Sequence, residues 1–311
     1  MIYLRSFSFV PPSIDENFEV PETCYGSIYP FRVFPNIGLE TIEFAPLTIL
    51  YGGNGSGKTT AMNVIAEKIR LPRRSRFNAS PFFDAYVSRC RADVSALPPD
   101  SRILVSDDVF DDLLDLRAVN EGIDQEREKL FRKWQAVRQK GRAGYHRFIN
   151  LDTFEKWKEE SEILKKNATK SKFVNKRLPI NLESGSNGES GFRFFVESLK
   201  PDNLYLLDEP ENSLSAAWQM KLATVIEGMA RFERCQFVIA THSPFLLAMK
   251  GAKILDLDTE GAPVRKWTEL ENVRLYRNFF AGHEKEFSAG GGCASAIPPP
   301  PSSPEGHTSP G

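Results

Sequence analysis

The chain has 311 residues, of which 41% are hydrophobic and 26% charged, and its formal net charge is -1. This composition is typical of a globular protein with a sizeable core, and the balanced charge gives no global attraction to nucleic acid or to an anionic membrane. We find no apolar run near the roughly twenty residues that span a bilayer, and no secretory signal pattern at the start. The four cysteines are scattered, which favours reduced thiols in a cytoplasmic protein over a zinc site or a disulfide framework.

The first part of the chain is predicted to form strands that lead into one strong motif. Apolar patterning predicts strands over residues 2–9, 42–44 and 47–51. Residues 52–59 then read Gly-Gly-Asn-Gly-Ser-Gly-Lys-Thr, which matches the phosphate-binding loop pattern G-x-x-x-x-G-K-[ST]. A helix with one apolar face follows and stops before Pro72. The motif therefore stands between a strand and a helix, as this kind of loop requires.

Each part of the loop has a physical role in holding a nucleotide. Glycines let backbone N–H groups approach phosphate oxygens, and the N-terminus of the next helix adds partial positive charge. Lys58 adds a full charge on the β- and γ-phosphates, and the Thr59 hydroxyl can ligate Mg²⁺. An ordinary glycine-rich turn is the alternative. The predicted nucleotide-binding residues of this stretch are Gly52, Gly53, Asn54, Gly55, Ser56, Gly57, Lys58, Thr59 and Thr60.

The middle of the chain is predicted to be mainly helical. Residues 101–105 form a short strand candidate, and Ser106 or Asp107 can cap the helix after it. Residues 119–177 are highly charged and leave little room for a core, so we interpret about 73–180 as a helical insertion on the surface of one domain. The candidate packing stripe in this region consists of Phe131, Trp134 and Val137.

Later in the chain, strands and helices alternate. Residues 203–207 and 236–240 are continuous apolar runs on either side of a helix, which predicts a parallel, buried sheet. We therefore expect an α/β fold of the P-loop NTPase class, with a mostly parallel sheet flanked by helices, an N-terminal antiparallel β part and the helical insertion. Residues 1–287 form the expected ATPase domain. Residues 288–311 are rich in Pro, Gly and Ser and are expected to be disordered.

Acidic and imidazole side chains follow the two late strands. Asp208 and Glu209 come directly after a buried strand, so they reach the carboxyl edge where α/β sheets bind ligands. Asp208 is placed to hold Mg²⁺ opposite Thr59, and Glu209 can polarise the water that attacks the γ-phosphate. His242 follows the neighbouring strand and can hydrogen-bond the γ-phosphate and that water. A surface acid pair and a structural histidine are the alternatives.

These motifs together resemble the ATP-binding-cassette class of P-loop ATPases. Residues 52–59 stand as Walker A, residues 204–209 as Walker B, and His242 as the switch histidine. The resemblance is strongest to the small predicted soluble ATPases related to the chromosome-maintenance and recombination group. The class's signature motif is matched by Ser186, Gly188 and Glu189, and residues 213–215 occupy the D-loop position.

The resemblance implies a mechanism and a set of partners. ATP and Mg²⁺ are the implied cofactors, with Lys58, Glu209 and His242 as catalytic residues and Thr59 and Asp208 as metal ligands. The signature of a second protomer would cover the γ-phosphate, so an ATP-sandwiched homodimer is implied, which hydrolysis would release.

Some positions depart from the class or stay open. Ser215 replaces the D-loop aspartate, and Asp107 or Asp108 stands where the Q-loop glutamine should fall. Tyr29 or Phe31 could stack on adenine, although core packing explains them as well. Two basic runs, at 68–76 and 165–177, could track nucleic acid or could be solvated helical faces balanced by nearby acids.

Three other functions compete with a free-standing ATPase. The chain could be the ATP-binding subunit of an ABC membrane transporter, against which the replaced Q-loop glutamine and the acid at Glu189 count. It could be a nucleotide-gated module that binds DNA, RNA or an effector protein in defence or repair. A P-loop kinase is disfavoured, because Asp208, Glu209 and His242 supply groups that activate water.

Overall fold

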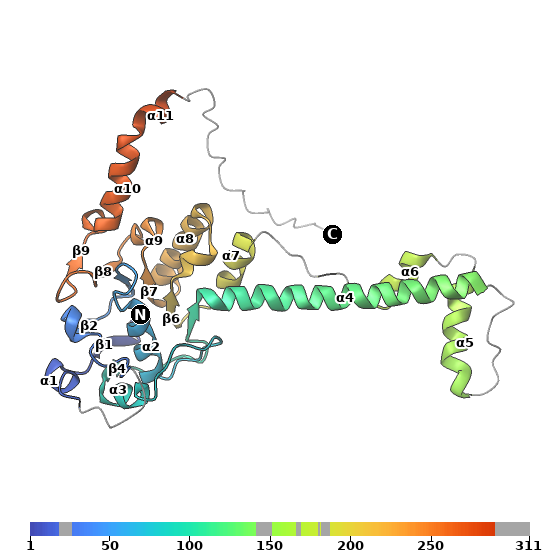
Figure 1. Ribbon diagram of the computed structural model, residues 1–311, viewed down its shortest axis with the longest axis horizontal. Helices are drawn as coiled ribbons and strands as arrows, with labels where there is room; N and C mark the ends of the chain where they lie inside the picture. The colour runs from blue at the N-terminus through green and yellow to red at the C-terminus, as the bar shows by residue number, and fades with distance from the viewer. Residues whose placement is uncertain (19–26, 141–150, 166–168, 180, 182–186, 290–311) are drawn as a thin grey trace, which may run out of the picture. The chain divides into compact units, whose positions relative to one another are not determined.

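The computed structural model describes residues 1–18, 27–140, 151–165, 169–179, 181 and 187–289 (Figure 1). The chain divides into two compact units, Met1–Arg265 and Lys266–Gly311. The first unit holds two sheets, the helices packed on them and a helical arm. Its strands are β1 (Leu4–Ser8), β2 (Thr41–Glu43), β3 (Leu47–Tyr51), β4 (Arg91–Val94), β5 (Arg102–Val105), β6 (Leu204–Asp208), β7 (Gln236–Thr241), β8 (Lys253–Asp256) and β9 (Val264–Arg265).

The larger sheet has six strands in the order β5-β6-β7-β3-β8-β9. All neighbouring pairs are parallel except β8 with β9, which is antiparallel. Every residue of β3, β6 and β7 is buried, so both faces of the central strands are covered. The expected α/β fold with a mostly parallel sheet is confirmed, as is the expectation that the strand before His242 lies beside the strand that ends at Asp208.

The smaller sheet is antiparallel, in the order β2-β1-β4, and confirms the expected N-terminal β part. Gln236 at the start of β7 joins the two sheets, because its side chain accepts from the amides of Tyr3 and Leu4 and donates to the Leu4 carbonyl at 2.8 Å. Residues 83–105 supply α3 (Phe83–Arg89), β4 and β5 to this body. The range given for the helical insertion therefore began too early, and the helical arm starts at Ser106.

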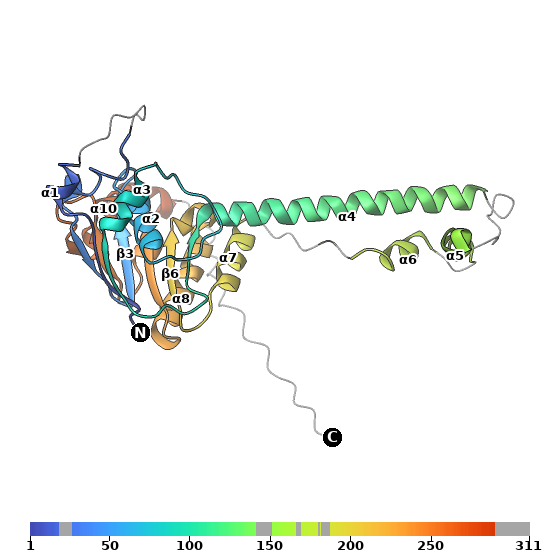
Figure 2. The ribbon, with the colours of Figure 1, turned by 90° about the horizontal axis from the view of Figure 1, so that it is seen from below.

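Helices of different lengths pack on the sheets. α2 packs against β6, and α8 packs against α7 (Figure 2). α2 also contacts β7, and α8 also contacts β7 and α9. The helical segments of this body are α1 (Pro12–Asp15), η1 (Pro35–Ile37), α2 (Lys58–Lys68), α7 (Asn187–Ser198), η3 (Pro210–Ser213), α8 (Ala216–Phe232) and α9 (Pro244–Leu247).

The arm is built on α4 (Ser106–Lys140), which contacts α7 and η3 near its start and α5 (Leu151–Leu164) and α6 (Lys170–Asn175) farther along. Of the apolar residues in its first turns, Val109 and Leu113 are buried while Phe110 and Leu114 are exposed. The predicted stripe is confirmed as a packing surface. Its residues Phe131, Trp134 and Val137 pack against buried Ile163, Phe173 and Val174.

The second unit contains η4 (Trp267–Glu269), α10 (Glu271–Gly282) and α11 (Glu284–Ala289). Leu275, Phe279 and Phe280 are more than half exposed on α10. The predicted disordered tail lies outside the described residues from 290 onwards, whereas residues 288 and 289 end α11. Over the part of the chain that the structure describes, no helix has both the length and the apolarity to cross a membrane.

Candidate functional site

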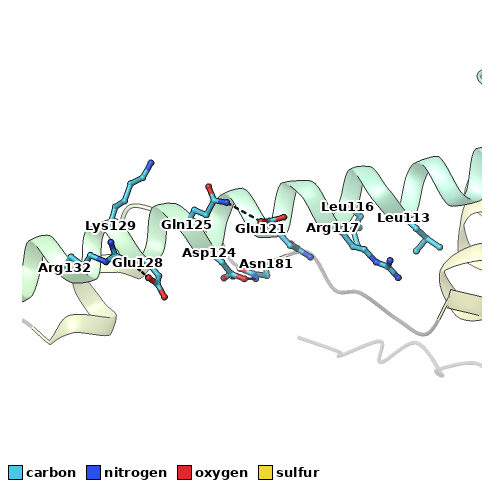
Figure 3. A pocket seen from close by; sticks show the side chains of 11 residues that line it. Leu113, Leu116, Arg117, Glu121, Asp124, Gln125, Glu128, Lys129, Arg132 and Asn181 are labelled. Carbon is cyan, nitrogen blue, oxygen red and sulfur yellow. Dashed lines mark hydrogen bonds and ion pairs between the residues drawn. The ribbon is translucent and has the colours of Figure 1, made fainter.

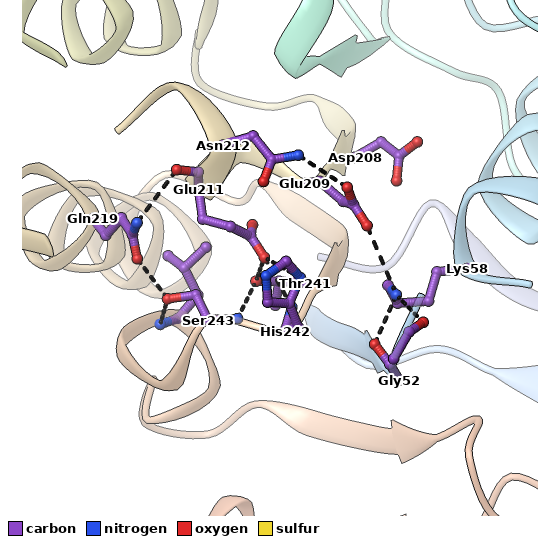
Figure 4. Close-up of polar contacts among 12 residues, drawn as sticks. Gly52, Lys58, Asp208, Glu209, Glu211, Asn212, Gln219, Thr241, His242 and Ser243 are labelled. Carbon is purple, nitrogen blue, oxygen red and sulfur yellow. Dashed lines mark hydrogen bonds and ion pairs between the residues drawn. The ribbon is translucent and has the colours of Figure 1, made fainter. Parts of the chain in front are cut away.

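The carboxyl ends of three adjacent strands bring the predicted chemical groups together. β7 lies between β3 and β6, with Tyr51 opposite Thr241 and Asp208 opposite Ala240. The loop after β3, the acids after β6 and the histidine after β7 therefore open on one edge of the sheet (Figure 4). This meeting point was expected from the sequence, because parallel strands present their carboxyl ends at the same edge.

The loop has a geometry that only glycine tolerates at two positions. Gly55 and Gly57 have φ angles of 84° and 86°, in the left-handed region that side chains disfavour. A Cβ on Gly57 would lie 3.1 Å from Ile37 Cδ1, so the preceding η1 region packs directly beneath the loop. Gly53 donates its amide to both carboxylate oxygens of Asp258, at 3.0 and 2.9 Å. The loop is thus held from two sides by segments distant in sequence.

Lys58 is buried, and its amine folds back over the loop. Nζ donates to the carbonyls of Gly52 at 2.7 Å and Gly53 at 2.8 Å, and it lies 3.7 Å from Glu209 Oε1. Only 3% of the side chain is exposed. Because α2 begins at Lys58, the free amides of its first turn point to the same place as this charge. The arrangement can bind an anion.

Thr59 and Asp208 form the oxygen pair expected for a divalent cation. The Thr59 hydroxyl donates to Asp208 Oδ1 at 3.2 Å. Burial and, next, the neighbouring Glu209 carboxylate raise the pKa of Asp208 to about 7. A cation would offset this cost, and hard oxygen donors suit Mg²⁺. The two residues therefore fit the predicted metal, with the remaining ligands left to water and phosphate.

Glu209 is held in a strained conformation beside this pair. Its φ and ψ are 47° and 51°, which is rare for a residue with a side chain, and Pro210 follows it. The side chain is 26% exposed, and Oε2 accepts from Asn212 Nδ2 at 2.9 Å. Such strain is concentrated at functional sites, where surrounding contacts hold it in place.

His242 lies at the end of β7 with its side chain 37% exposed. Its backbone amide donates to Glu211 Oε1 at 2.8 Å, and its ring Nδ1 lies 3.3 Å from the same oxygen. Glu211 was not predicted as a site residue, since an acid two positions after Glu209 has no motif that marks it. Only the turn of η3 brings it back under β7.

The residues assigned to the signature motif lie at the start of α7. Ser186 falls outside the described residues, and Glu189 is exposed. The atoms nearest to a Cβ on Gly188 would be those of Trp218 at 3.0 Å and the Ser215 amide. Within one chain, these neighbours of Gly188 belong to the start of α8 rather than to residues 52–60.

The two candidates for stacking on adenine, Tyr29 and Phe31, have different surroundings. Phe31 is 3% exposed and stacks on Phe18, with ring centroids 3.9 Å apart, so it belongs to the core. Tyr29 instead donates its hydroxyl to Thr60 Oγ1 at 3.1 Å. Thr60 is thereby occupied by Tyr29.

A cleft of about 490 Å³ adjoins the Thr59–Asp208 pair. Asp107 lines it, whereas Asp108 is buried and accepts from the amides of Ser75 at 2.9 Å and Val105 at 3.0 Å. Asp108 therefore fixes the start of α4, and Asp107 is the acid that faces the site. The other side chains along the cleft include Tyr29, Asn63, Arg73, Arg76, Phe77, Glu209 and Asn212.

A larger hollow of about 760 Å³ follows α4 between Leu113 and Arg132 (Figure 3). It is lined mostly by charged and amide side chains of that helix. The basic runs are partly neutralised by neighbours, since Arg74 pairs with Asp112 and Asp115, while Lys176 and Arg177 both pair with Glu162. This pairing favours solvated surface charges for both runs, although Arg73, Arg74 and Arg76 lie in the loop after α2 and not on a helix.

Comparison with known proteins gives one family. Residues 66–248 match the model of the family described as "AAA domain, putative AbiEii toxin, Type IV TA system". The matched range includes β6 and His242 and begins after the Walker A loop. The comparison with curated proteins gives no match.

Several solved structures are similar at low identity. The Smc head domain of Pyrococcus furiosus, bound to the C-terminal domain of ScpA, is 12% identical and covers 92% of this chain and 100% of its own, with a TM-score of 0.37. The SMC head domain of Thermotoga maritima is 11% identical over 85% and 99%, with a TM-score of 0.34. The ATP-binding cassette MJ0796, in a dimeric post-hydrolysis state with ADP and Pi, is 16% identical over 86% and 99%, with a TM-score of 0.36.

Proposed function

The chain belongs to the family described as "AAA domain, putative AbiEii toxin, Type IV TA system", a family of nucleotide-binding ATPase domains, and from this premise we propose that it is an Mg²⁺-dependent ATP hydrolase. The observation that carries the proposal is the meeting of four groups at one sheet edge. Lys58, the Thr59–Asp208 pair, Glu209 and His242 come from three separate segments and share the carboxyl ends of β3, β6 and β7.

Each side chain has a role that follows from its position. Lys58 and the first amides of α2 bind the β- and γ-phosphates. Thr59 and Asp208 hold Mg²⁺, which when bound neutralises phosphate charge. Glu209, fixed by Asn212, accepts a proton from the attacking water, and His242 donates to the γ-phosphate or orients that water.

We propose further that ATP joins two copies of the chain. Residues 53–55 and Thr59 are exposed in a single copy, so one side of the triphosphate would face solvent. The start of α7 presents amides at a helix N-terminus, and its own chain places Gly188 beside Trp218 of α8. A second copy could bring this helix start to the exposed phosphate.

Phosphate release and molar mass in each nucleotide state test both parts. Lys58→Ala should abolish turnover, whereas Lys68→Ala, at the half-buried far end of the same helix, should leave it intact. Glu209→Gln should bind ATP without hydrolysing it and should accumulate as a dimer with Mg²⁺ and ATP. Full activity of Lys58→Ala would remove the site assignment. A monomeric Glu209→Gln with bound Mg²⁺ and ATP would remove only the dimer.

A second candidate function has one observation in its favour. The arm of α4, α5 and α6 is held together by its own buried apolar cluster around Phe173, so it can stay folded and offer its polar outer surface to a partner. The family description names a toxin and a type IV toxin–antitoxin system. The chain would then be an ATP-gated module for an effector protein or nucleic acid. Turnover that depends on added DNA, RNA or a copurified protein would favour this candidate.

A further inference from the structure

Three polar groups at the end of β7 converge on one carboxylate oxygen. Glu211 Oε1 accepts from the Thr241 hydroxyl at 2.6 Å and from the His242 amide at 2.8 Å, and the His242 ring Nδ1 lies 3.3 Å away. Only 5% of the Glu211 side chain is exposed. Figure 4 shows this carboxylate between the β7 end and η3. A buried carboxylate in this place contacts the imidazole directly.

A proton on His242 Nδ1 could help to stabilise the buried Glu211 carboxylate. The Thr241 hydroxyl and the His242 amide are neutral donors, and burying a carboxylate is costly unless its charge is met. Among the described residues, Glu211 Oε2 has no hydrogen-bond partner. A hydrogen on His242 Nδ1 would give Oε1 a third donor at 3.3 Å, and the carboxylate in turn favours that hydrogen.

We propose that Glu211 is the positioning residue of His242, and that it holds the ring with its proton on Nδ1 so that Nε2 is directed to the nucleotide. This inference rests on the proposed function for the role of Nε2. The two ring nitrogens are chemically distinct, and the partner of one decides the protonation of the other. A carboxylate that orients a histidine in this way acts through the histidine and does not touch substrate.

The surrounding hydrogen bonds make Glu211 a suitable anchor. Gln219 on α8 donates to the carbonyls of Leu214 at 2.8 Å and Glu211 at 3.3 Å, and it accepts from the Ser243 hydroxyl at 2.6 Å. The Ser243 amide in turn donates to Thr241 Oγ1 at 3.0 Å. These bonds tie the turn that carries His242 to the turn that follows Glu209. The general base and the histidine therefore keep a fixed relative placement.

The test combines a double-mutant cycle with a spectroscopic measurement. Glu211→Gln keeps the shape and an oxygen acceptor but removes the charge, and it is compared with the wild type, His242→Ala and the double variant. We expect Glu211→Gln to lower kcat by about 10- to 100-fold with ATP affinity unchanged. In the His242→Ala background it should cost nothing more, because its effect passes through the ring. Glu227→Gln is the matched control, since its carboxylate accepts a backbone amide, that of Lys250, outside the site.

Long-range ¹H–¹⁵N spectra of the full chain read the tautomer without relying on turnover. The His242 signals, identified by their loss in His242→Ala, should show a protonated Nδ1 in the wild type and a shift toward protonated Nε2 in Glu211→Gln. A wild-type proton on Nε2, or equal losses of kcat in both backgrounds, would overturn the inference. If the wild type does not hydrolyse ATP, the proposed function fails, and the tautomer still decides the role of Glu211.

Discussion

Neutralising Asp208 should make the nucleotide-free protein more stable, with a gain that grows as the pH rises. The carboxylate is buried, and its pKa is raised from an ordinary 3.8 to about 7, mainly by burial and then by Glu209. A group of this kind stabilises the folded chain while it is protonated. That contribution is complete below pH 3.8 and is lost as the pH rises to about 7. Asp208→Asn cannot ionise, so its stability should not decline in this way.

The size of the effect follows from the two pKa values. The difference between 3.8 and about 7 corresponds to about 4 kcal/mol of unfolding free energy. Part of the stability that protonated Asp208 contributes is already lost at pH 5. The remaining loss of unfolding free energy between pH 5 and pH 8 is about 2 to 3 kcal/mol. For a chain of this size, that amounts to a difference in Tm of about 5 °C.

Scanning calorimetry at pH 5, 6, 7 and 8, with EDTA and without nucleotide, measures this difference directly. The Tm of Asp208→Asn should exceed that of the wild type by an amount that increases with pH. Adding Mg²⁺ and ATP should raise the Tm of the wild type at pH 8 much more than that of the variant, because only the wild type keeps the carboxylate that we propose as a metal ligand.

The control is a second buried carboxylate at the same sheet edge. Asp256 ends β8 and pairs with Arg265 at 3.0 Å, so Asp256→Asn should lower the Tm at pH 8 by leaving the guanidinium without its partner. Parallel Tm–pH curves for the wild type and Asp208→Asn would refute the reasoning, since they would mean that burial does not hold the proton on Asp208.

Three further predictions concern separate parts of the structure. Gly57→Ala places a side chain at φ 86° beside Ile37, so it should lower the unfolding free energy by about 1 to 3 kcal/mol and weaken ATP binding. In the control Gly228→Ala, in α8, the new methyl group meets nothing within 4 Å and should raise the unfolding free energy by about 0.5 to 1 kcal/mol. Calorimetry and ATP titration compare the two variants. Phe173→Ala should lower the stability of the arm by about 3 kcal/mol, because it removes a buried ring from the arm's apolar cluster. Limited proteolysis of the arm should become faster, while the rate of ATP turnover should stay unchanged. Hydrogen bonds from Lys176 and Arg177 lower the pKa of Glu162 to about 2, so the stability that this carboxylate adds is present above pH 4.5 and is lost as the pH falls toward 2. Glu162→Gln should remove this dependence on acid. Urea titration at pH 7 should show that the variant loses at most about 1 kcal/mol of unfolding free energy.

The central sheet could be predicted because its strands are continuous apolar runs, each followed by residues that match a phosphate-binding loop or carry an acidic or imidazole side chain. β3, β6 and β7 were expected within one or two residues of where they lie, and their shared edge follows from parallel pairing. β4 was missed for a physical reason. Its residues alternate between exposed and partly buried, and its partner β1 lies some ninety residues earlier in the chain, so no local pattern marks it.

The site was predictable only where a motif carries the chemistry. Lys58, Thr59, Asp208 and Glu209 stand in patterns that a strand and a helix frame. Asp258, which holds the Gly53 amide, and Arg73, which stacks 4.2 Å over Phe77 beside the cleft, have no such frame. Their places depend on how distant loops return to the sheet edge. Glu211 is the clearest case, since its partners Thr241 and His242 are about thirty residues away and only the folded turn unites them.

The charge balance at the sheet edge bears on which form of ATP the site accepts. Asp208 ends β6, and Glu209 and Glu211 follow it within three positions. Among the described residues, Lys58 is the one lysine or arginine within ion-pair distance of any of them. The nucleotide-free site already holds the proton on Asp208 up to about pH 7. A bare triphosphate would be attracted by Lys58 and the first amides of α2 but would add negative charge beside Asp208 and Glu209, whereas the same triphosphate with Mg²⁺ brings the cation that lets Asp208 ionise. Under the proposed function we therefore expect the metal–nucleotide complex to bind more tightly than free ATP, so ATP affinity should fall steeply when EDTA removes the metal.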